Sequence, residues 1–211
     1  TVLVLCVSVQ TLQAKTLTFA TEATYPPFVS MAAESNKLVG FGPELVQAIC
    51  QEMKVKCNLV NAPWDSLIPS LAMGKYDALF GGMAITKARE KVVDFSLPYY
   101  QNNITFVVNK KSPLTVSEAS LKGKTIGVQG GTTFQQYLHV KYGKAVKLKI
   151  YASNMTALLD LKSGRVDTVF VDKPVAALWI KKEANKDYKM VGNIQDTQLF
   201  GPGNAIAINK N

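Results

Sequence analysis

Two distant segments of the chain repeat one pattern, and this repeat constrains the fold more than any other feature. Residues 67–80 (LIPSLAMGKYDALF) and 157–170 (ALLDLKSGRVDTVF) each read as an apolar helix, a glycine, a basic residue, an aspartate and an apolar strand that ends in phenylalanine. Helices that alternate with strands are typical of α/β folds. With a similar strand, glycine and helix arrangement elsewhere, the repeat predicts two α/β lobes whose strand ends look into one cleft.

The stretch at residues 77–89 follows the first copy of the repeat. It reads as a short strand, then Gly81 and Gly82, then a helical turn that Thr86 can cap and that carries Arg89. Ligands of open α/β sheets bind just beyond the carboxyl ends of strands. Glycines leave backbone groups accessible there, and an arginine can bind a carboxylate through two N–H donors. Taken alone, an arginine in a loop is more often a surface residue.

Length and composition agree with a globular protein that has one large or two small domains. The chain has 211 residues, of which 47% are hydrophobic and 18% are charged. Residues 1–14 carry no charge, read as apolar through Val9 and end in alanine, which is typical of a secretory signal whose start is missing. A buried first strand is the alternative, and the apolar run is too short for a membrane-spanning helix. We therefore expect an exported protein.

The expected export also guides the interpretation of the three cysteines. Cys6 lies in the signal segment, where Leu5 precedes it instead of the small residue that a lipid-anchor box requires. Cys50 and Cys57 remain as an even pair in an exported chain, which predicts a disulfide between the end of one helix and the next strand. A metal site would need nearby histidine or carboxylate ligands, and a redox site would favour C-x-x-C.

The net charge of +9 raises the question of nucleic-acid binding. The lysines are scattered singly or in pairs, such as Lys110–Lys111 and Lys181–Lys182, and no basic stripe is interleaved with aromatic residues. This pattern indicates a solvated basic surface and no nucleic-acid partner.

The hydrophobic pattern along the chain predicts short strands and helices in alternation. Strands are expected at residues 15–20, 37–41, 55–60, 78–80, 92–95, 104–109, within 121–128, and at 146–151, 166–170 and 204–208. Helices are expected at residues 42–54, 64–74, 133–142, 154–162 and 172–182. The bend at 129–133 (QGGTT) places two hydroxyls after two glycines, which suits an anion at a helix start. The G-K-[ST] tail of a nucleotide-binding loop is absent.

Seven residues follow expected strand ends, namely Glu22, Tyr25, Trp64, Gly82, Arg89, Thr133 and Asp172. As a set they suit a zwitterion with a cationic tail. Arg89 would bind the α-carboxylate through two donors, helped by the helix start at Thr133. Asp172 would pair with the α-ammonium group.

The other end of such a ligand would lie against the loop after the first strand. Two prolines follow Tyr25 and break the strand, so Glu22 and Tyr25 stand where α/β proteins place ligand contacts. Tyr25 and Trp64 would enclose the ligand's methylene groups, and their ring faces favour a cation. Glu22 would meet the distal positive charge. A capping glutamate and a packing tyrosine are the alternative reading of this loop.

Several motifs together resemble the periplasmic amino-acid-binding proteins of ABC importers, most closely the arginine-binding and lysine/arginine/ornithine-binding branch of bacterial solute-binding protein family 3. They are TEATYPPF, VGFGPEL, the Cys50 and Cys57 pair, WDSLIPSL, GGMAIT-x-x-R, LKGKTIGVQGGTT, GRVD-x-V-x-x-D and LFGPG. The resemblance runs from residue 15 to the end of the sequence. Together these motifs are highly specific, although none is specific alone.

The resemblance implies a two-lobed α/β fold, the type II fold of periplasmic binding proteins, in which each lobe is a mixed sheet flanked by helices. Lobe 1 is expected at residues 15–103 and lobe 2 at 104–201, and residues 202–211 return to lobe 1. Hinges are expected near residues 100–105 and 200–204. The resemblance also implies the roles given above for six of the seven residues, all except Gly82, and adds three to the ligand-binding set, namely Gly81, Ala84 and Gln129.

Three positions depart from the family pattern. Ala84 stands where aspartate or serine is common, and aromatic Phe134 stands where a polar residue is usual, so both changes bear on the choice of ligand. Gly42–Pro43 replaces a Phe-Asp continuation. The family also implies two further helices of lobe 1 beyond Asn211, without which part of the lobe 1 sheet would expose apolar surface.

The favoured function is a monomeric solute-binding protein without catalytic residues, metal or cofactor, which captures L-arginine or a related cationic amino acid for a membrane permease. A periplasmic dehydratase of the same lobe design is the alternative, with Glu22 or Asp172 as general base. No nucleophile and base set is visible, and His139 is expected on the surface. A pure interaction module is a third possibility.

Overall fold

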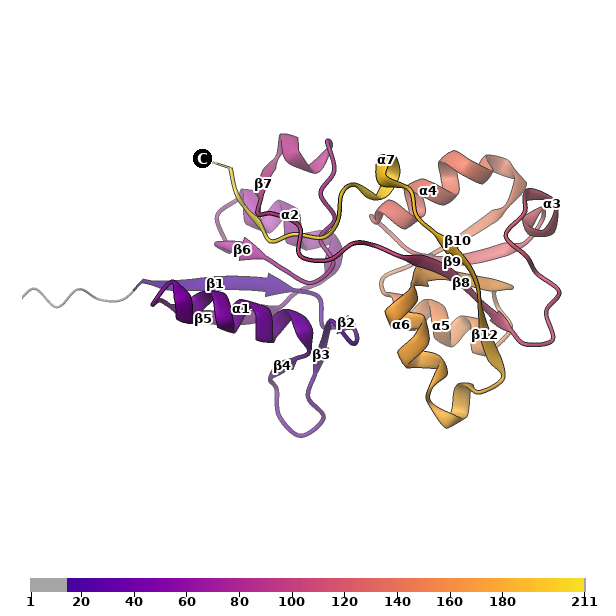
Figure 1. Ribbon diagram of the computed structural model, residues 1–211, viewed down its shortest axis with the longest axis horizontal. Coiled ribbons are helices and arrows are strands. Elements are labelled where there is room, and N and C mark those ends of the chain that lie inside the picture. Colours follow the sequence, from indigo (N-terminus) through magenta and orange to yellow (C-terminus); the bar gives the residue numbers. More distant parts are fainter. Residues whose placement is uncertain (1–14, 211) are drawn as a thin grey trace, which may run out of the picture.

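The computed structural model describes residues 15–210, and it forms two lobes side by side along the long axis (Figure 1). The sheet of lobe 1 has the strand order β5 (Lys56–Asn61), β1 (Thr16–Thr21), β6 (Ala78–Leu79), β13 (Ala207–Asn209) and β7 (Val93–Phe95). Strands β5, β1 and β6 are parallel, and β13 is antiparallel to both of its neighbours. The last strand of the chain thus lies inside the first lobe's sheet.

The sheet of lobe 2 is built on the same plan. Its order is β10 (Lys147–Tyr151), β9 (Thr125–Gln129), β11 (Thr168–Asp172), β8 (Ile104–Asn109) and β12 (Tyr188–Ile194). Strands β10, β9 and β11 are parallel, and β8 is antiparallel to β11 and β12. Both sheets are therefore mixed, and the predicted two-lobed α/β fold is confirmed.

The repeat in the sequence has a structural counterpart at the start of each lobe's first parallel strand. The backbone N–H of Asp77 donates to the carbonyl of Thr18 at 2.9 Å, and its carboxylate accepts from the N–H of Thr18 at 2.8 Å. Asp167 makes the same pair with Thr125, at 2.9 and 2.7 Å. Each aspartate thereby ties the turn before its strand to the neighbouring strand.

Helices cover the sheets on both faces in lobe 2 and unevenly in lobe 1. In lobe 1, α1 (Phe41–Glu52) lies beside β5, and α2 (Trp64–Ala72) covers the opposite face (Figure 1). In lobe 2, α5 (Asn154–Lys162) and α6 (Lys173–Ile180) cover one face, and α4 (Thr133–Tyr142) covers the other. The short helices are α3 (Glu118–Leu121) and α7 (Thr197–Phe200), with 3-10 turns at Arg89–Lys91, Gly143–Ala145 and Glu183–Asn185.

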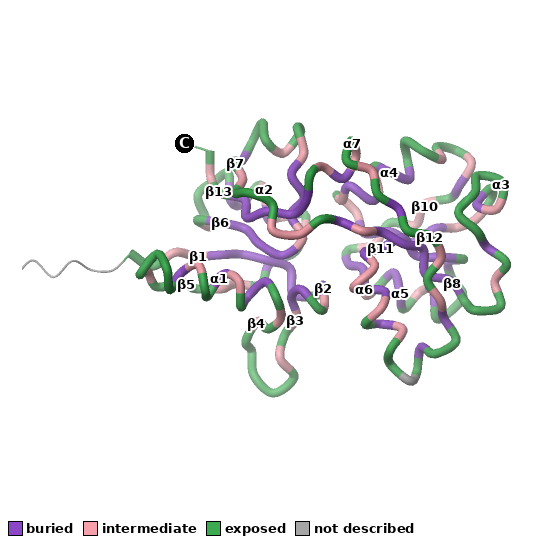
Figure 2. Tube along the Cα trace, in the orientation of Figure 1, coloured by how far each residue is buried: buried purple, intermediate pink, exposed green. Residues whose placement is uncertain are grey.

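The buried side chains follow these layers. Leu67 and Leu71 of α2 pack with Leu79 and other small or aliphatic residues of the sheet. In lobe 2, Phe106 of β8 and Phe170 of β11 stand opposite each other, and they belong to one buried cluster with aromatic residues of α4. Figure 2 shows the central strands of this lobe in purple, the colour of buried residues. The buried strands are continuous runs of apolar residues because both faces of their sheet are covered.

Several elements differ from the sequence-based expectation, among them the short helices α3 and α7, which were not predicted. Strand β12 was not predicted, because its sequence, YKMVGNI, mixes lysine and glycine with apolar residues at the sheet's edge. The last strand occupies Ala207–Asn209 instead of residues 204–208, and Asn204 forms isolated bridges with Ala84 and Tyr100. A small third sheet, of β2 (Thr24–Tyr25), β3 (Val29–Met31) and β4 (Leu38–Val39), surrounds the two prolines.

The predicted disulfide is confirmed between Cys50 at the end of α1 and Cys57 in β5. The expected signal segment lies outside the described residues. No helix in the part of the chain that is described has both the length and the apolar character needed to cross a bilayer.

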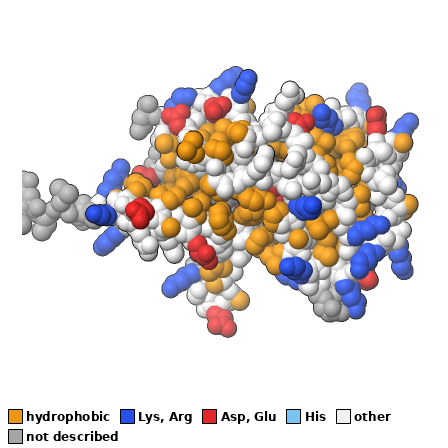
Figure 3. Space-filling view, in the orientation of Figure 1, with side chains coloured by type: hydrophobic (Ala, Val, Ile, Leu, Met, Phe, Trp, Pro, Cys, Tyr) orange, Lys and Arg blue, Asp and Glu red, His pale blue; other side chains and the backbone are white. Residues whose placement is uncertain are grey.

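An apolar groove lies on the face of the lobe 1 sheet that α1 covers only in part. Leu17, Ile49, Met53 and Ile208 line it, and Met53 is 53% exposed. Figure 3 shows hydrophobic side chains gathered on lobe 1 and many lysine or arginine side chains around the rim of lobe 2.

Candidate functional site

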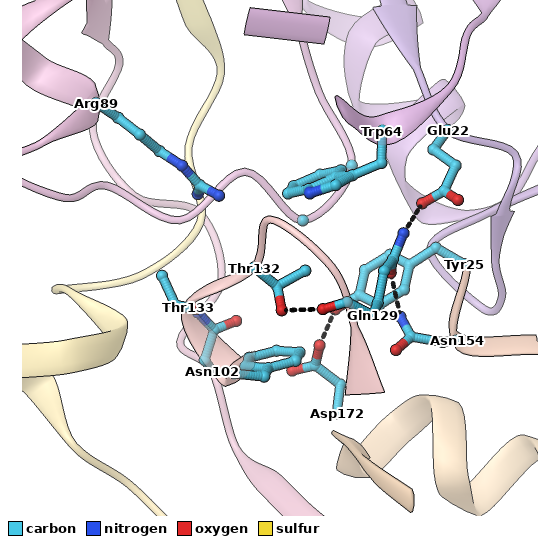
Figure 4. Close-up of a pocket in the computed structure, with 13 residues that line it drawn as sticks. Glu22, Tyr25, Trp64, Arg89, Asn102, Gln129, Thr132, Thr133, Asn154 and Asp172 are labelled. Atoms are coloured by element: carbon cyan, nitrogen blue, oxygen red, sulfur yellow. Dashed lines mark hydrogen bonds between the residues drawn. The ribbon is translucent and has the colours of Figure 1, made fainter. Parts of the chain in front are cut away.

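A pocket lies between the two lobes, at the ends of their strands (Figure 4). Its lining residues are Glu22, Tyr25, Trp64, Gly81, Gly82, Arg89, Asn102, Gln129, Thr132, Thr133, Phe134, Asn154 and Asp172. The structure thus brings together all but one of the residues that the sequence nominated.

Arg89 places a half-buried cation in this pocket. Its backbone N–H donates to the Thr86 hydroxyl at 3.2 Å, which caps the turn as expected. The guanidinium donates to the Ala84 carbonyl at 2.8 Å and lies over the Trp64 ring, 5.4 Å from its centroid. Burial lowers the pKa of Arg89 to about 10, so the side chain stays charged at neutral pH. A half-buried cation with donors to spare is suited to an anionic group.

The N-terminus of α4 faces the same region. Thr132 is its N-cap, with a hydroxyl that accepts from the Gln135 N–H at 3.3 Å and donates to the Gln129 carbonyl at 2.8 Å. Thr133, the first residue of the helix, is buried in the pocket wall. A helix N-terminus carries free N–H groups and a partial positive charge. Together with Arg89, it forms the electropositive part of the pocket.

Asp172 provides the first of two buried carboxylates. It stands at the end of β11, and its Oδ2 accepts a hydrogen bond from the Tyr25 hydroxyl across the lobes. Its Oδ1 has no hydrogen-bond partner among the described residues. Burial raises the pKa of Asp172 to about 7. A cationic group beside Oδ1 would satisfy this oxygen and favour the ionised carboxylate.

Aromatic rings and two glycines shape the pocket's wall. Tyr25 stacks on Phe28, with ring centroids 5.0 Å apart, which holds the tyrosine ring in place. At Gly82 a Cβ would stand 2.8 Å from the Tyr25 ring, and at Gly81 a Cβ would stand 2.5 Å from the Thr21 hydroxyl. Both glycines also have positive φ angles, 86° at Gly81 and 91° at Gly82. A side chain at either position would therefore fill or distort the wall.

Glu22 provides the second carboxylate and lies in a chain of polar side chains. Its Oε1 accepts from the Thr24 hydroxyl at 2.8 Å, and its Oε2 accepts from Gln129 Nε2, also at 2.8 Å. Gln129 Nε2 also donates to the Ala152 carbonyl at 3.0 Å, and Gln129 Oε1 accepts from Asn154 Nδ2 at 2.9 Å. Burial raises the pKa of Glu22, and the bonds from Gln129 and Thr24 oppose this rise.

Ala84 is the nominated residue that does not line the pocket. It is 2% exposed, and its carbonyl is used by Arg89 while its backbone pairs with Asn204. Its contact with a ligand, expected from the family pattern, stays a prediction; the structure shows only its contact with Arg89 and its backbone pairing. A hydrogen-bonding side chain common at this position in the family is absent here.

Sequence reasoning missed four lining residues, which are Asn102, Thr132, Phe134 and Asn154. Thr132 and Asn154 carried a usable signal, because each lies at a helix start just after a strand. Asn102 lies in a crossing segment between the lobes, where no local pattern indicates a pocket. Phe134 had been noted only as a departure, and its ring packs with Phe170 at 6.2 Å.

Nothing in the pocket resembles a nucleophile activated by a neighbouring base. Among residues 15–210, no group of three or more His, Cys, Asp or Glu side chains is arranged to hold a metal ion. His139 lies exposed on α4, as expected.

Comparisons with known proteins agree with this description. The model of the bacterial extracellular solute-binding proteins, family 3, matches residues 17–189. The ABC transporter arginine-binding protein 1 of Escherichia coli is 42% identical over 195 residues, covering 92% of this chain and 78% of its own length. The histidine-binding periplasmic protein of Salmonella typhimurium is 35% identical over 193 residues, with 90% and 74% covered.

Among solved structures, a Salmonella typhimurium periplasmic binding protein described for its high arginine specificity superimposes with a TM-score of 0.85. It is 40% identical, and the match covers 93% of this chain and 86% of that one. These relatives are binding proteins and not enzymes, so the dehydratase alternative has less support. The chain belongs to the bacterial extracellular solute-binding proteins of family 3.

Proposed function

We propose that this protein binds a cationic L-amino acid, arginine foremost, between its lobes and delivers it to the membrane permease of an ABC transporter. The observation that carries the proposal is the distribution of charge in the pocket. A cation, Arg89, and two carboxylates, Asp172 and Glu22, line one small cavity. They complement the carboxylate, the ammonium and the side-chain cation of such a ligand. Relatives described as arginine-binding support this choice.

Each part of the ligand has a proposed partner. Arg89 and the N–H groups at Thr133 bind the α-carboxylate, and Asp172 binds the α-ammonium through its free oxygen. Tyr25 and Trp64 enclose the methylene groups. Glu22 binds the side-chain cation. Gly81 and Gly82 let the ligand approach the backbone because neither places a Cβ in the wall.

We propose that the lobes, at residues 15–103 with 202–211 and at 104–201, close on the ligand about two crossing segments. These segments are tied together where Asn204 donates to Asn102 Oδ1 at 2.8 Å and to the Tyr100 carbonyl at 2.7 Å. The bonds from Tyr25 to Asp172 and from Gln129 to Glu22 join the lobes inside the pocket. Hinge closure of this kind buries a ligand from both sides.

The remaining expectations belong to the same proposal. The protein acts as a monomer, and its closed form docks on the permease. Residues 1–14 belong to a secretion signal that directs the protein to the periplasm. Relatives described as periplasmic support this localisation.

Thermal unfolding with a panel of amino acids tests the proposal. A ligand at a hundredfold excess over its dissociation constant adds about 2.7 kcal/mol to the free energy of unfolding. L-Arginine is expected to raise the melting temperature strongly, with L-lysine and L-ornithine next. L-Glutamate, which carries the opposite side-chain charge, serves as the control. If no amino acid in the panel shifts the transition, the protein is not an amino-acid-binding protein.

A further inference from the structure

The hydrogen-bond chain beside Glu22 can run in one direction only. The carbonyl of Ala152 can only accept, so the Gln129 atom 3.0 Å from it must be the amide nitrogen. The oxygen of Gln129 then faces Asn154 and accepts from its amide nitrogen at 2.9 Å. The Ala152 carbonyl, which can only accept, thus fixes the orientation of the Gln129 amide, and Gln129 in turn fixes that of the Asn154 amide. The oxygen of Asn154 is the group left over.

This oxygen is an unused acceptor in the pocket wall. Asn154 is 3% exposed and lines the pocket, and its Oδ1 has no hydrogen-bond partner among the described residues. Figure 4 shows this oxygen turned away from Gln129. Asp172 Oδ1 is in the same situation in the same pocket. Leaving a buried acceptor unpaired is unfavourable, so a ligand that donates to it gains affinity.

We propose that Asn154 determines specificity by accepting a hydrogen bond from the guanidinium of bound arginine. This inference rests on the proposed function and adds a second side-chain acceptor to Glu22. The two acceptors are joined through a single side chain, Gln129, so they stand at the same end of the pocket. A guanidinium has five N–H donors spread over a planar group and can bind two acceptors in different directions.

Bound lysine would make a poorer hydrogen bond to the Asn154 oxygen. Its ammonium group ends the side chain at the position of the guanidinium carbon, one bond short of the terminal nitrogens of arginine. Removal of the Asn154 oxygen is therefore expected to weaken arginine binding more than lysine binding. Gln129 has a different part, because both of its N–H donors are already used by Glu22 and Ala152. It is a positioning residue for Glu22 and Asn154.

The test compares dissociation constants for L-arginine and L-lysine by isothermal titration. Asn154→Ala is expected to weaken arginine binding about tenfold, the effect of one hydrogen bond to a charged group, and lysine binding less than about threefold. Asn154→Ser, whose hydroxyl is too short to reach, is expected to act alike and replaces it if the alanine variant does not fold. An unchanged arginine-to-lysine ratio in the folded variant overturns the inference.

Asn102→Ala is the matched control, because it also truncates a buried asparagine of this pocket. Asn102 is buried in one of the crossing segments, and its oxygen already accepts from Asn204. It is expected to leave the arginine-to-lysine ratio unchanged, whatever it does to overall affinity. An equal fall of the ratio in this control would mean that the effect is general loosening of the pocket, and would also overturn the inference.

The Asn154→Ala change is also made in a Gln129→Met variant, which distinguishes direct contact of Asn154 with the ligand from mere support of Gln129 by Asn154. In Gln129→Met the amide is gone, so Asn154 has nothing left to orient. If Asn154 contacts the ligand, Asn154→Ala still lowers the ratio in this background; if it only supports Gln129, the ratio stays unchanged, and the inference fails. Failure of the proposed function is distinguishable, because then the wild-type protein binds neither amino acid.

Discussion

The hydroxyl of Tyr25 donates a hydrogen bond to the carboxylate of Asp172, so a strand end of lobe 2 is joined to the first loop of lobe 1 inside the pocket. The bond satisfies one carboxylate oxygen and leaves the other unpaired. Burial outweighs this bond and raises the pKa of Asp172 to about 7. The group proposed to bind the α-ammonium therefore changes charge near neutral pH.

Arginine affinity is expected to depend on pH through Asp172. The folded-state pKa of about 7 lies above the usual value near 3.9, so the free protein loses stability as pH rises from about 4 to 7. A ligand ammonium prefers the ionised carboxylate. Affinity should therefore fall by up to about tenfold for each pH unit below 7.

Isothermal titration between pH 5 and 8 measures this dependence. Asp172→Asn removes the titrating group, so its weaker binding should show a much flatter pH profile. If the variant and the wild type have the same slope, a group other than Asp172 is responsible.

Replacement of Arg89 by lysine is expected to weaken the binding of every amino acid to a similar extent. Lysine keeps the positive charge but lacks the planar group that reaches the Ala84 carbonyl and lies over Trp64. We expect a loss of about tenfold or more for arginine, lysine and glutamine alike, measured by titration. A loss confined to the cationic ligands would place Arg89 at the side-chain end of the ligand instead. Circular dichroism checks that the variant is folded.

Replacement of Glu22 by glutamine is expected to act selectively. The change removes the charge beside the ligand's side chain, so arginine should bind about tenfold less tightly while glutamine binding changes little. Asp65→Asn is the matched control, since Asp65 is an exposed carboxylate near Glu22 that does not line this pocket. Equal losses for arginine and glutamine in Glu22→Gln would argue against the assigned role.

Two glycines with similar backbone angles allow a clean test of the pocket wall. Gly82 has φ 91° and its Cβ would meet the Tyr25 ring at 2.8 Å, whereas Gly74 has φ 73° and open space around it. Alanine at either position lowers the free energy of unfolding through the backbone strain of a positive φ, on the order of 1 kcal/mol. Only Gly82→Ala should also lower arginine affinity. Comparable affinities in the two variants would show that the Tyr25 ring yields to the added methyl group.

Local patterns predicted most of the regular elements. The helices α1, α2, α4 and α5 were expected within a few residues because each joins an apolar face to a glycine, proline or hydroxyl at its start or end. Strand β12 escaped prediction because an edge strand with a bulge shows no clean alternation. Its pairing with the long strand β8 is decided by tertiary contact.

Some residues of the candidate site could likewise be predicted from sequence, and others could not. Arg89, Asp172 and Glu22 could be nominated because strand ends and glycines mark their positions, and the family pattern adds Gln129. Ala84 lies outside the pocket lining, and the folded chain adds the direction of its backbone carbonyl, which accepts from Arg89 and which no sequence pattern records. Asn154 was missed because its role depends on Ala152 and Gln129, whose orientation emerges only from the folded hydrogen-bond chain.

The sequence by itself determined the two-lobed α/β plan, the pairing of Cys50 with Cys57 and the chemical types of the groups at the strand ends. These follow from periodicity, turn residues and spacing, which act over a few residues. Only the tertiary structure decided which groups face one another across the lobes, which acceptors stay unpaired and how far burial shifts the pKa of Asp172. These depend on distances and desolvation between segments far apart in the chain, which no local pattern encodes.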